Sequence, residues 1–115
     1  MRRFALSVLL MIPALQAQTV IATFDAPDTG ITGLACGGGF LWAADGTTRY
    51  LYKMDPASGE VLDSWYAEAI PIAETLTGLG FGNNTLYVAG STGTTGNIYT
   101  YTVEGAYGTS FTVNC

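Results

Sequence analysis

The tetrapeptide Ile31-Thr32-Gly33-Leu34 returns 45 residues later as Leu76-Thr77-Gly78-Leu79. The likeness continues at the same offset, with three further matches: Gly37 with Gly82, Leu41-Trp42 with Leu86-Tyr87, and Ala44 with Ala89. Self-similarity at a spacing of 20–50 residues is typical of a chain built from repeated structural units. The repeat therefore governs the fold prediction, although it says little about activity.

The composition favours short strands and tight turns in one small domain. The chain has 115 residues, of which only 11% are charged, and it contains 15 glycines and seven tyrosines. Such a mixture fits pleated strands better than helices. The sequence has no histidine, which removes the commonest general base and the commonest metal ligand from any site.

Residues 1–17 have the pattern of a secretory signal peptide. Arg2 and Arg3 precede an apolar core, Phe4–Leu15, that is too short to span a bilayer of about 30 Å, and the small residue Ala17 ends the segment. The alternative is a buried N-terminal helix. We expect cleavage after Ala17, a secreted or periplasmic mature chain of residues 18–115, and no membrane contact after cleavage, because no other apolar run is long enough to span.

The mature chain is strongly acidic. Without the two leader arginines, Arg49 and Lys53 face nine acidic residues, a net charge of −7 against −5 for the whole chain. Such a surface repels phosphate backbones, so we expect no nucleic-acid partner. A weak attraction for cations or basic partners remains open.

Alternation of apolar residues, bounded by turn residues, predicts four strands in each repeat. The turns rest on glycine, asparagine and proline, which favour tight reversals. We expect an outer strand at 20–24 and then two units, 31–65 and 76–113, separated by a loop at 66–75. The expected strands of these units are 32–36, 40–44, 50–54 and 60–65, then 77–81, 85–89, 98–102 and 107–113.

Four antiparallel strands in about 45 residues is the size of one β-propeller blade. The stretches Gly33–Gly46 and Leu51–Val61 resemble blades of secreted bacterial propellers of the YVTN, NHL and quinoprotein type, and those of streptogramin lyase and glutamine cyclotransferase. The sequence departs from that pattern at Cys36–Gly38, where an Asp-Gly turn is common. The resemblance implies an all-β fold of two four-stranded antiparallel blades, and it is nearly silent on activity because the matching residues are structural.

Two blades cannot close a ring, which typically needs four to eight. Each blade buries its faces against neighbours, so a lone pair leaves two apolar faces in water. Three accounts stay open: the chain assembles with copies of itself as a subunit of an oligomeric ring, it belongs to a longer propeller with further blades, or it remains an open pair.

Propeller loops that join blades, and those that join second to third strands, lie on one face. Here these are residues 25–30, 45–49, 66–75 and 91–97, where the two repeats differ most, as binding loops on rigid scaffolds do. The candidate binding residues are the charged ones in these loops: Asp25, Asp28, Asp45, Arg49, Glu68 and Glu74.

Several motifs have a chemical and a structural interpretation. Asp28-Thr29-Gly30 matches the aspartic-protease triplet, but Pro27 is unsuited to the central strand that should precede it. Asp45 and Asp55 stand beside Gly or Pro, which favours turn chemistry over a metal site. Asn83-Asn84-Thr85 fits both a glycosylation acceptor and a hairpin tip.

The two cysteines, Cys36 and Cys115, both lie in the exported part. In an oxidising compartment they could form a disulfide. The alternative is that Cys36 is a small buried residue, because it aligns with Phe81 of the second repeat.

No nucleophile elbow, phosphate loop or dinucleotide fingerprint is present, so we expect no cofactor and no metal. The aromatic residues could stack on sugars, although aromatic residues at alternate strand positions more often pack between blades. The predicted function is a secreted non-catalytic module that binds a protein, a glycan or a small ligand. The alternative is a piece of a secreted propeller enzyme, of lyase or cyclotransferase type, whose active site lies in missing blades; the lack of histidine weighs against it.

Overall fold

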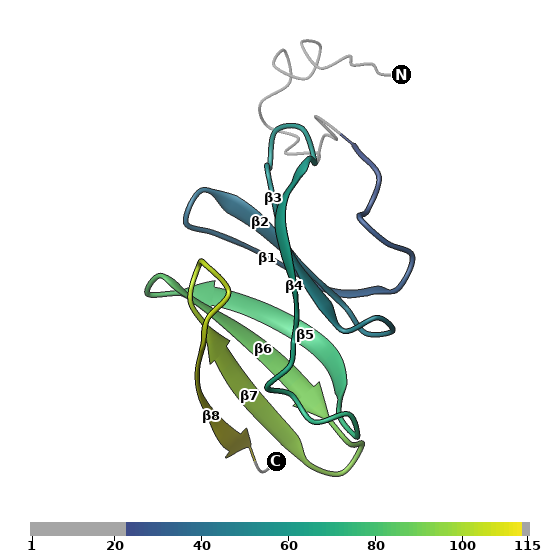
Figure 1. The fold of residues 1–115 in the computed structure, drawn as a ribbon, viewed down its shortest axis with the longest axis vertical. Helices are drawn as coiled ribbons and strands as arrows, with labels where there is room; N and C mark the ends of the chain where they lie inside the picture. The colour runs from purple at the N-terminus through teal and green to yellow at the C-terminus, as the bar shows by residue number, and fades with distance from the viewer. Residues whose placement is uncertain (1–22, 114–115) are drawn as a thin grey trace, which may run out of the picture.

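The computed structural model describes residues 23–113, which form two four-stranded antiparallel sheets, as predicted (Figure 1). In both sheets the spatial order of the strands is their order along the chain. Sheet 1 contains β1 (Ile31–Gly37), β2 (Phe40–Asp45), β3 (Tyr50–Met54) and β4 (Val61–Tyr66). Sheet 2 contains β5 (Thr75–Gly82), β6 (Thr85–Ser91), β7 (Gly96–Tyr101) and β8 (Tyr107–Val113). Within the described range no helix is long and apolar enough to cross a membrane.

The first hairpin of each sheet turns on residues that tolerate left-handed backbone angles. Gly38 and Gly39 have φ values of 64° and 86°, and Asn83 and Asn84 have 50° and 56° at the same place in the second repeat. Glycine adopts such angles freely, and asparagine does so at lower cost than most residues. The tight hairpins predicted at both positions are therefore confirmed.

The repeat extends to irregularities of the strands. The register shifts between Ile31 and Gly33 in sheet 1, and between Leu76 and Gly78 in sheet 2. Next to each shift a threonine hydroxyl lies near a carbonyl of the neighbouring strand, Thr32 at 3.5 Å and Thr77 at 3.4 Å from their acceptors. A β-bulge changes the direction in which the neighbouring side chains point. Because both sheets have the irregularity at the same place in the repeat, equivalent side chains lie on equivalent faces.

The sheets pack face to face around Trp42. Its indole stacks on Phe81 of sheet 2 with ring centroids 5.5 Å apart and 14° between the planes, and it meets Trp65 edge-on at 6.3 Å. The indole Nε1 donates a hydrogen bond of 3.1 Å to the Gly37 carbonyl, which satisfies its polar atom. The rest of the buried cluster is aliphatic or aromatic: Ala44, Leu51, Ala67, Ile70, Leu76, Leu86, Val88, Tyr99 and Tyr101.

The inner strands β1 and β5 approach each other closely. A Cβ built on Gly33 would lie 3.0 Å from the Gly78 Cα, and one built on Gly37 would overlap the Phe81 ring. The Thr32 hydroxyl donates a 2.8 Å hydrogen bond to the Leu76 carbonyl across the same boundary. Glycine in β1 is therefore what lets sheet 2 sit against sheet 1.

The segment before β1 lies only partly within the described range. Thr23 and Phe24, the last two residues of the outer strand predicted at 20–24, are described and form no strand. The predicted signal peptide, residues 20–22 and Cys115 lie outside the described residues.

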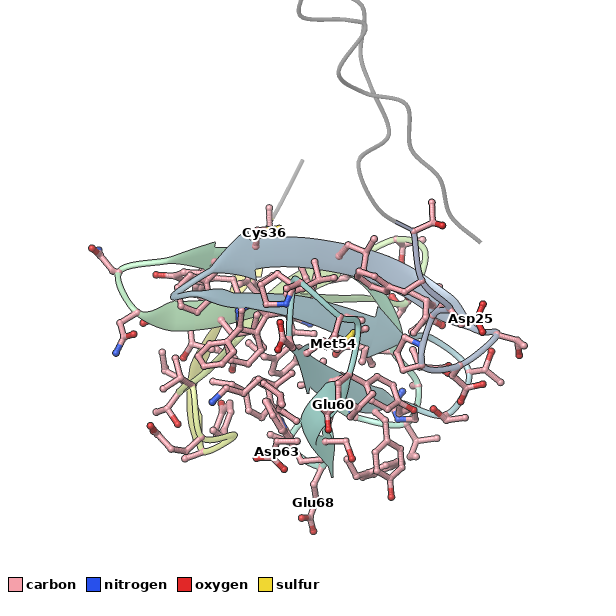
Figure 2. All side chains as sticks on the ribbon, turned by 90° about the horizontal axis from the view of Figure 1, so that it is seen from above. Asp25, Cys36, Met54, Glu60, Asp63 and Glu68 are labelled. Carbon is pink, nitrogen blue, oxygen red and sulfur yellow. The ribbon has the colours of Figure 1, made fainter. Side chains whose placement is uncertain are left out.

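Cys36 is exposed, and Figure 2 shows it projecting outward from the molecule. The alternative prediction that it is a small buried residue is therefore wrong. The reason is the packing of the sheets: Phe81, its repeat equivalent, stacks on Trp42 between the two sheets, whereas neither described sheet lies against the same face of β1. A disulfide between Cys36 and Cys115 stays a prediction.

Candidate functional site

Four loops gather at one end of the two sheets, as the sequence predicted, because antiparallel strands return to the same end at every second connection. We call this region the loop end: residues 23–30, 46–49, the linker 67–74 between the sheets, and 92–95. The first two loops are joined by a hydrogen bond of 2.9 Å from the Gly46 N–H to the Gly30 carbonyl. Three of the predicted site residues make further hydrogen bonds within and between these loops.

Asp45, at the end of β2, is fully buried and shapes the β2–β3 turn. Its Oδ1 accepts hydrogen bonds from the backbone N–H groups of Thr47 at 2.7 Å and Thr48 at 2.8 Å. Burial by itself raises the pKa of Asp45, but these backbone N–H groups and the nearby Asp28 together lower it below its ordinary value. Asp45 thus acts as the turn residue that the sequence indicated.

Arg49 connects the two sheets through the linker. Its guanidinium is buried, donating to the Glu74 carbonyl at 2.6 Å, the Ile70 carbonyl at 2.5 Å and the Pro71 carbonyl at 3.0 Å. A planar guanidinium carries five N–H donors, so one side chain can hold several carbonyls. Its φ of 69° is in the left-handed region, a backbone conformation that costs roughly 1–2 kcal/mol in residues other than glycine. The contacts of Arg49 offset that cost.

Glu74 connects the linker to sheet 2. The Tyr99 hydroxyl lies 2.9 Å from both of its carboxylate oxygens, and the Asn97 amide donates to Oε2 at 3.0 Å. Gly90 leaves room for this carboxylate, because a Cβ there would lie 2.7 Å from Oε1. Burial, together with the bond to Glu74, raises the pKa of Tyr99 to about 12. Arg49 meets Glu74 at its main-chain carbonyl, not at its carboxylate.

The other three candidates lie at or near the surface of the loop end. Asp25 and Glu68 are exposed, and Figure 2 shows them projecting outward and well apart. Asp28 is half-buried, and its Oδ1 accepts the Thr29 N–H at 2.6 Å. Ile72, in the linker, is 78% exposed. The six predicted residues therefore divide into a buried set that fixes the loops and an accessible set that a ligand can reach.

The protease-like triplet and the acidic side chains are the candidates for chemistry at the loop end. Asp28-Thr29-Gly30 forms a bend before β1, and the Asp28 carboxylate is engaged with the next residue. Between residues 23 and 113 no three histidine, cysteine or acidic side chains come together in a way that could hold a metal ion. What this end of the molecule presents is acidic and apolar surface on loops held by buried hydrogen bonds.

Sequence reasoning missed Tyr99 and Asn97 as partners of Glu74. Tyr99 is one of the aromatic residues for which the sequence allows sugar stacking or blade packing, and its burial agrees with packing. The contact depends on how the linker folds back onto β7, for which no local sequence signal exists.

No family model matches the chain, and no curated protein matches its sequence.

Proposed function

We propose that this chain is an exported, non-catalytic repeat module of the β-propeller type, and that its loop end binds a partner protein carrying positive charge. Two features support the architecture: each repeat is one four-stranded meander, and the repeats pack through the same inner strands, β1 and β5. Two arginines followed by an apolar core at residues 2–15 support export.

One observation carries the proposal for the loop end. Buried Arg49, which donates three hydrogen bonds, and buried Glu74, which accepts from Tyr99 and Asn97, fix the linker between the sheets while other side chains of the same loops stay accessible. A binding surface gains affinity when its loops need little ordering on contact. Burying the charge of Arg49 away from any carboxylate has a desolvation cost, which its hydrogen bonds to the linker carbonyls offset.

The accessible side chains favour a basic protein as the partner. Asp25, Asp28 and Glu68 supply negative charge, and the guanidinium of Arg49, the basic residue of these loops, is already bonded to carbonyls. Charge of one sign on the rim of a surface steers an oppositely charged partner. Exposed Ile72 adds the apolar contact that protein interfaces use at their centre.

The test compares two triple variants with the same net charge. The loop triple is D25N/D28N/E68Q, and the control triple is E60Q/D63N/E104Q, whose residues are exposed and lie outside the loop end. A displayed library of Lys- and Arg-containing peptides is selected on the wild-type protein, and the binders are measured on both variants by biolayer interferometry. Three charge contacts at or near the surface, at about 0.2–1 kcal/mol each, predict a loss of about tenfold for the loop triple and little loss for the control.

Equal losses in both triples would mean that only the overall acidity is being sensed, and the site assignment would fail. Binders whose contacts map to residues 55–59 or to the hairpin at 37–39 would contradict it as well. If a glycan array yields the only ligands and the loop triple abolishes their binding, the location stands and the partner class is wrong. Export is tested separately, by N-terminal sequencing of protein recovered from the medium or periplasm, which should begin at Gln18.

A further inference from the structure

Each sheet has two unlike faces, and among residues 23–113 only one pair of faces is matched. The glycine face carries Gly33, Gly37 and Trp42 in sheet 1, and Gly78, Gly82 and Tyr87 in sheet 2. The bulky face carries Leu79, Phe81 and Leu86 in sheet 2, and Leu34, Cys36 and Leu41 in sheet 1. Within the chain, the glycine face of sheet 1 packs on the bulky face of sheet 2.

The glycine face of sheet 2 has no neighbour within the described residues. A Cβ built on Gly80 or Gly82 would meet nothing within 4 Å, and one on Gly78 would meet only the Ala89 Cβ at 3.9 Å. None of the three has a positive φ. Neither the backbone nor the packing of this chain therefore requires glycine at these positions.

Glycine inside a strand is unfavourable by about 0.5–1 kcal/mol relative to alanine, and it often marks close approach by another backbone. At the equivalent positions in sheet 1, Gly33 is approached by the backbone of sheet 2 at Gly78, and Gly37 is approached by the side chain of Phe81. Gly78 and Gly82 therefore fit a neighbour shaped like the bulky face of sheet 2.

We propose that this neighbour is the bulky face of sheet 1 in a second copy of the chain. Leu34 and Cys36, the repeat equivalents of Leu79 and Phe81, are both exposed, with Leu34 at 61%. Ala43 and Met54 lie on the same face and are already buried within the chain. The part of this face that a second copy can reach is therefore on the inner strand β1. Inner strands also meet in the contact within the chain, where β1 lies against β5.

The contact within the chain predicts the contacts between copies. Gly82 lies against Cys36 of the second copy, as Gly37 lies against Phe81. Tyr87 covers that Cys36, as Trp42 stacks on Phe81. The Thr77 hydroxyl faces the Ile31 carbonyl of the second copy, as the Thr32 hydroxyl bonds to the Leu76 carbonyl.

This contact is head-to-tail, because each copy presents two different faces. Such association continues until a ring closes or a filament grows. If the sheets are propeller blades, a ring of typically four to eight blades takes two to four copies. The ring count rests on the proposed architecture, whereas the contact itself does not depend on what the loop end binds.

Disulfide trapping tests the contact directly. In the full chain carrying C115A, G82C places a thiol opposite Cys36 of the neighbouring copy. The equivalent Cβ on Gly37 lies 2.9 Å from the Phe81 Cβ, so a small outward shift reaches the roughly 3.5–4.5 Å that a disulfide spans. Mild oxidation should convert most of the protein into a ladder of covalent oligomers on a non-reducing gel. Adding C36A should reduce that ladder to dimers at most.

A57C, in the exposed turn between β3 and β4, is the matched control and should give no ladder. Equal ladders from G82C and A57C, or none from G82C, would overturn the proposal. A second measurement uses G82R, which should lower the sedimentation mass below that of the wild type at equal concentration, while A57R leaves the mass unchanged. A wild-type chain already monomeric in that experiment contradicts the proposal whatever the loop end binds.

Discussion

Replacing Arg49 with methionine tests whether the buried guanidinium holds the loop end together. The variant keeps a long apolar stem and the left-handed backbone angle, and it removes all three hydrogen bonds to the linker. The carbonyls of Ile70 and Glu74 are buried, whereas the bond to the Pro71 carbonyl is only partly buried and water can replace it. Two lost bonds from a charged donor, at about 1.5 kcal/mol each, predict a stability loss of about 3 kcal/mol.

The assay is urea unfolding followed by the fluorescence of Trp42 and Trp65, with melting temperature as a second readout. For a domain of this size, a loss of about 3 kcal/mol corresponds to a fall of at least about 12 °C. Lys53→Met is the control, since that ammonium lies 3.4 Å from the Val103 carbonyl and over the Phe40 ring, and its removal should cost under about 1 kcal/mol.

Hydrogen exchange locates the effect. Amides of the linker, where Glu74 N–H bonds to the Pro71 carbonyl and Ile70 N–H to the Ala67 carbonyl, should exchange faster in Arg49→Met and not in Lys53→Met. If the two variants lose equal stability, or if Arg49→Met stays within about 0.5 kcal/mol of wild type, the role assigned to Arg49 is refuted.

Two further predictions follow from packing and titration. Gly37→Ala places a methyl group into the Phe81 ring and should cost about 1–3 kcal/mol, whereas Gly82→Ala, at the equivalent open position, should leave the stability of the monomer unchanged or raised by up to about 1 kcal/mol. Equal losses in urea unfolding would contradict the assigned faces. The raised pKa of Tyr99, about 12, means that its contribution to stability is complete below pH 10 and lost as pH rises towards 12. Tyr99→Phe should flatten that part of the stability profile, and an unchanged slope would show that Tyr99 is not the group responsible.

The strands and hairpins could be predicted because their signals are local. Alternation from Thr85 to Ala89 fits a strand with a period of two, and Asn83-Asn84 supplies the two left-handed positions of the hairpin before it. Pro71 likewise marked the linker as a loop, since it cannot continue a helix.

The faces of the sheets could not be predicted, because both carry apolar residues and alternation does not say which face meets the other sheet. Cys36 and Phe81 occupy the same place in the repeat, yet one is exposed and the other packs on Trp42. The bonds of Arg49 to Ile70, Pro71 and Glu74 join residues 21 to 25 positions apart, and they exist only because the linker folds back as sheet 2 docks. The division of the candidate site into buried and accessible residues has the same origin.

The central claim is that each sheet needs a neighbour on both faces, so that the chain associates with its own copies. Analytical ultracentrifugation of the wild-type protein tests it most directly. We predict a discrete closed species of two to four copies whose mass stays constant over a wide concentration range. A monodisperse single copy that melts cooperatively would contradict the claim, because it would show that the open glycine face of sheet 2 and the exposed Leu34 face of sheet 1 are stable in water.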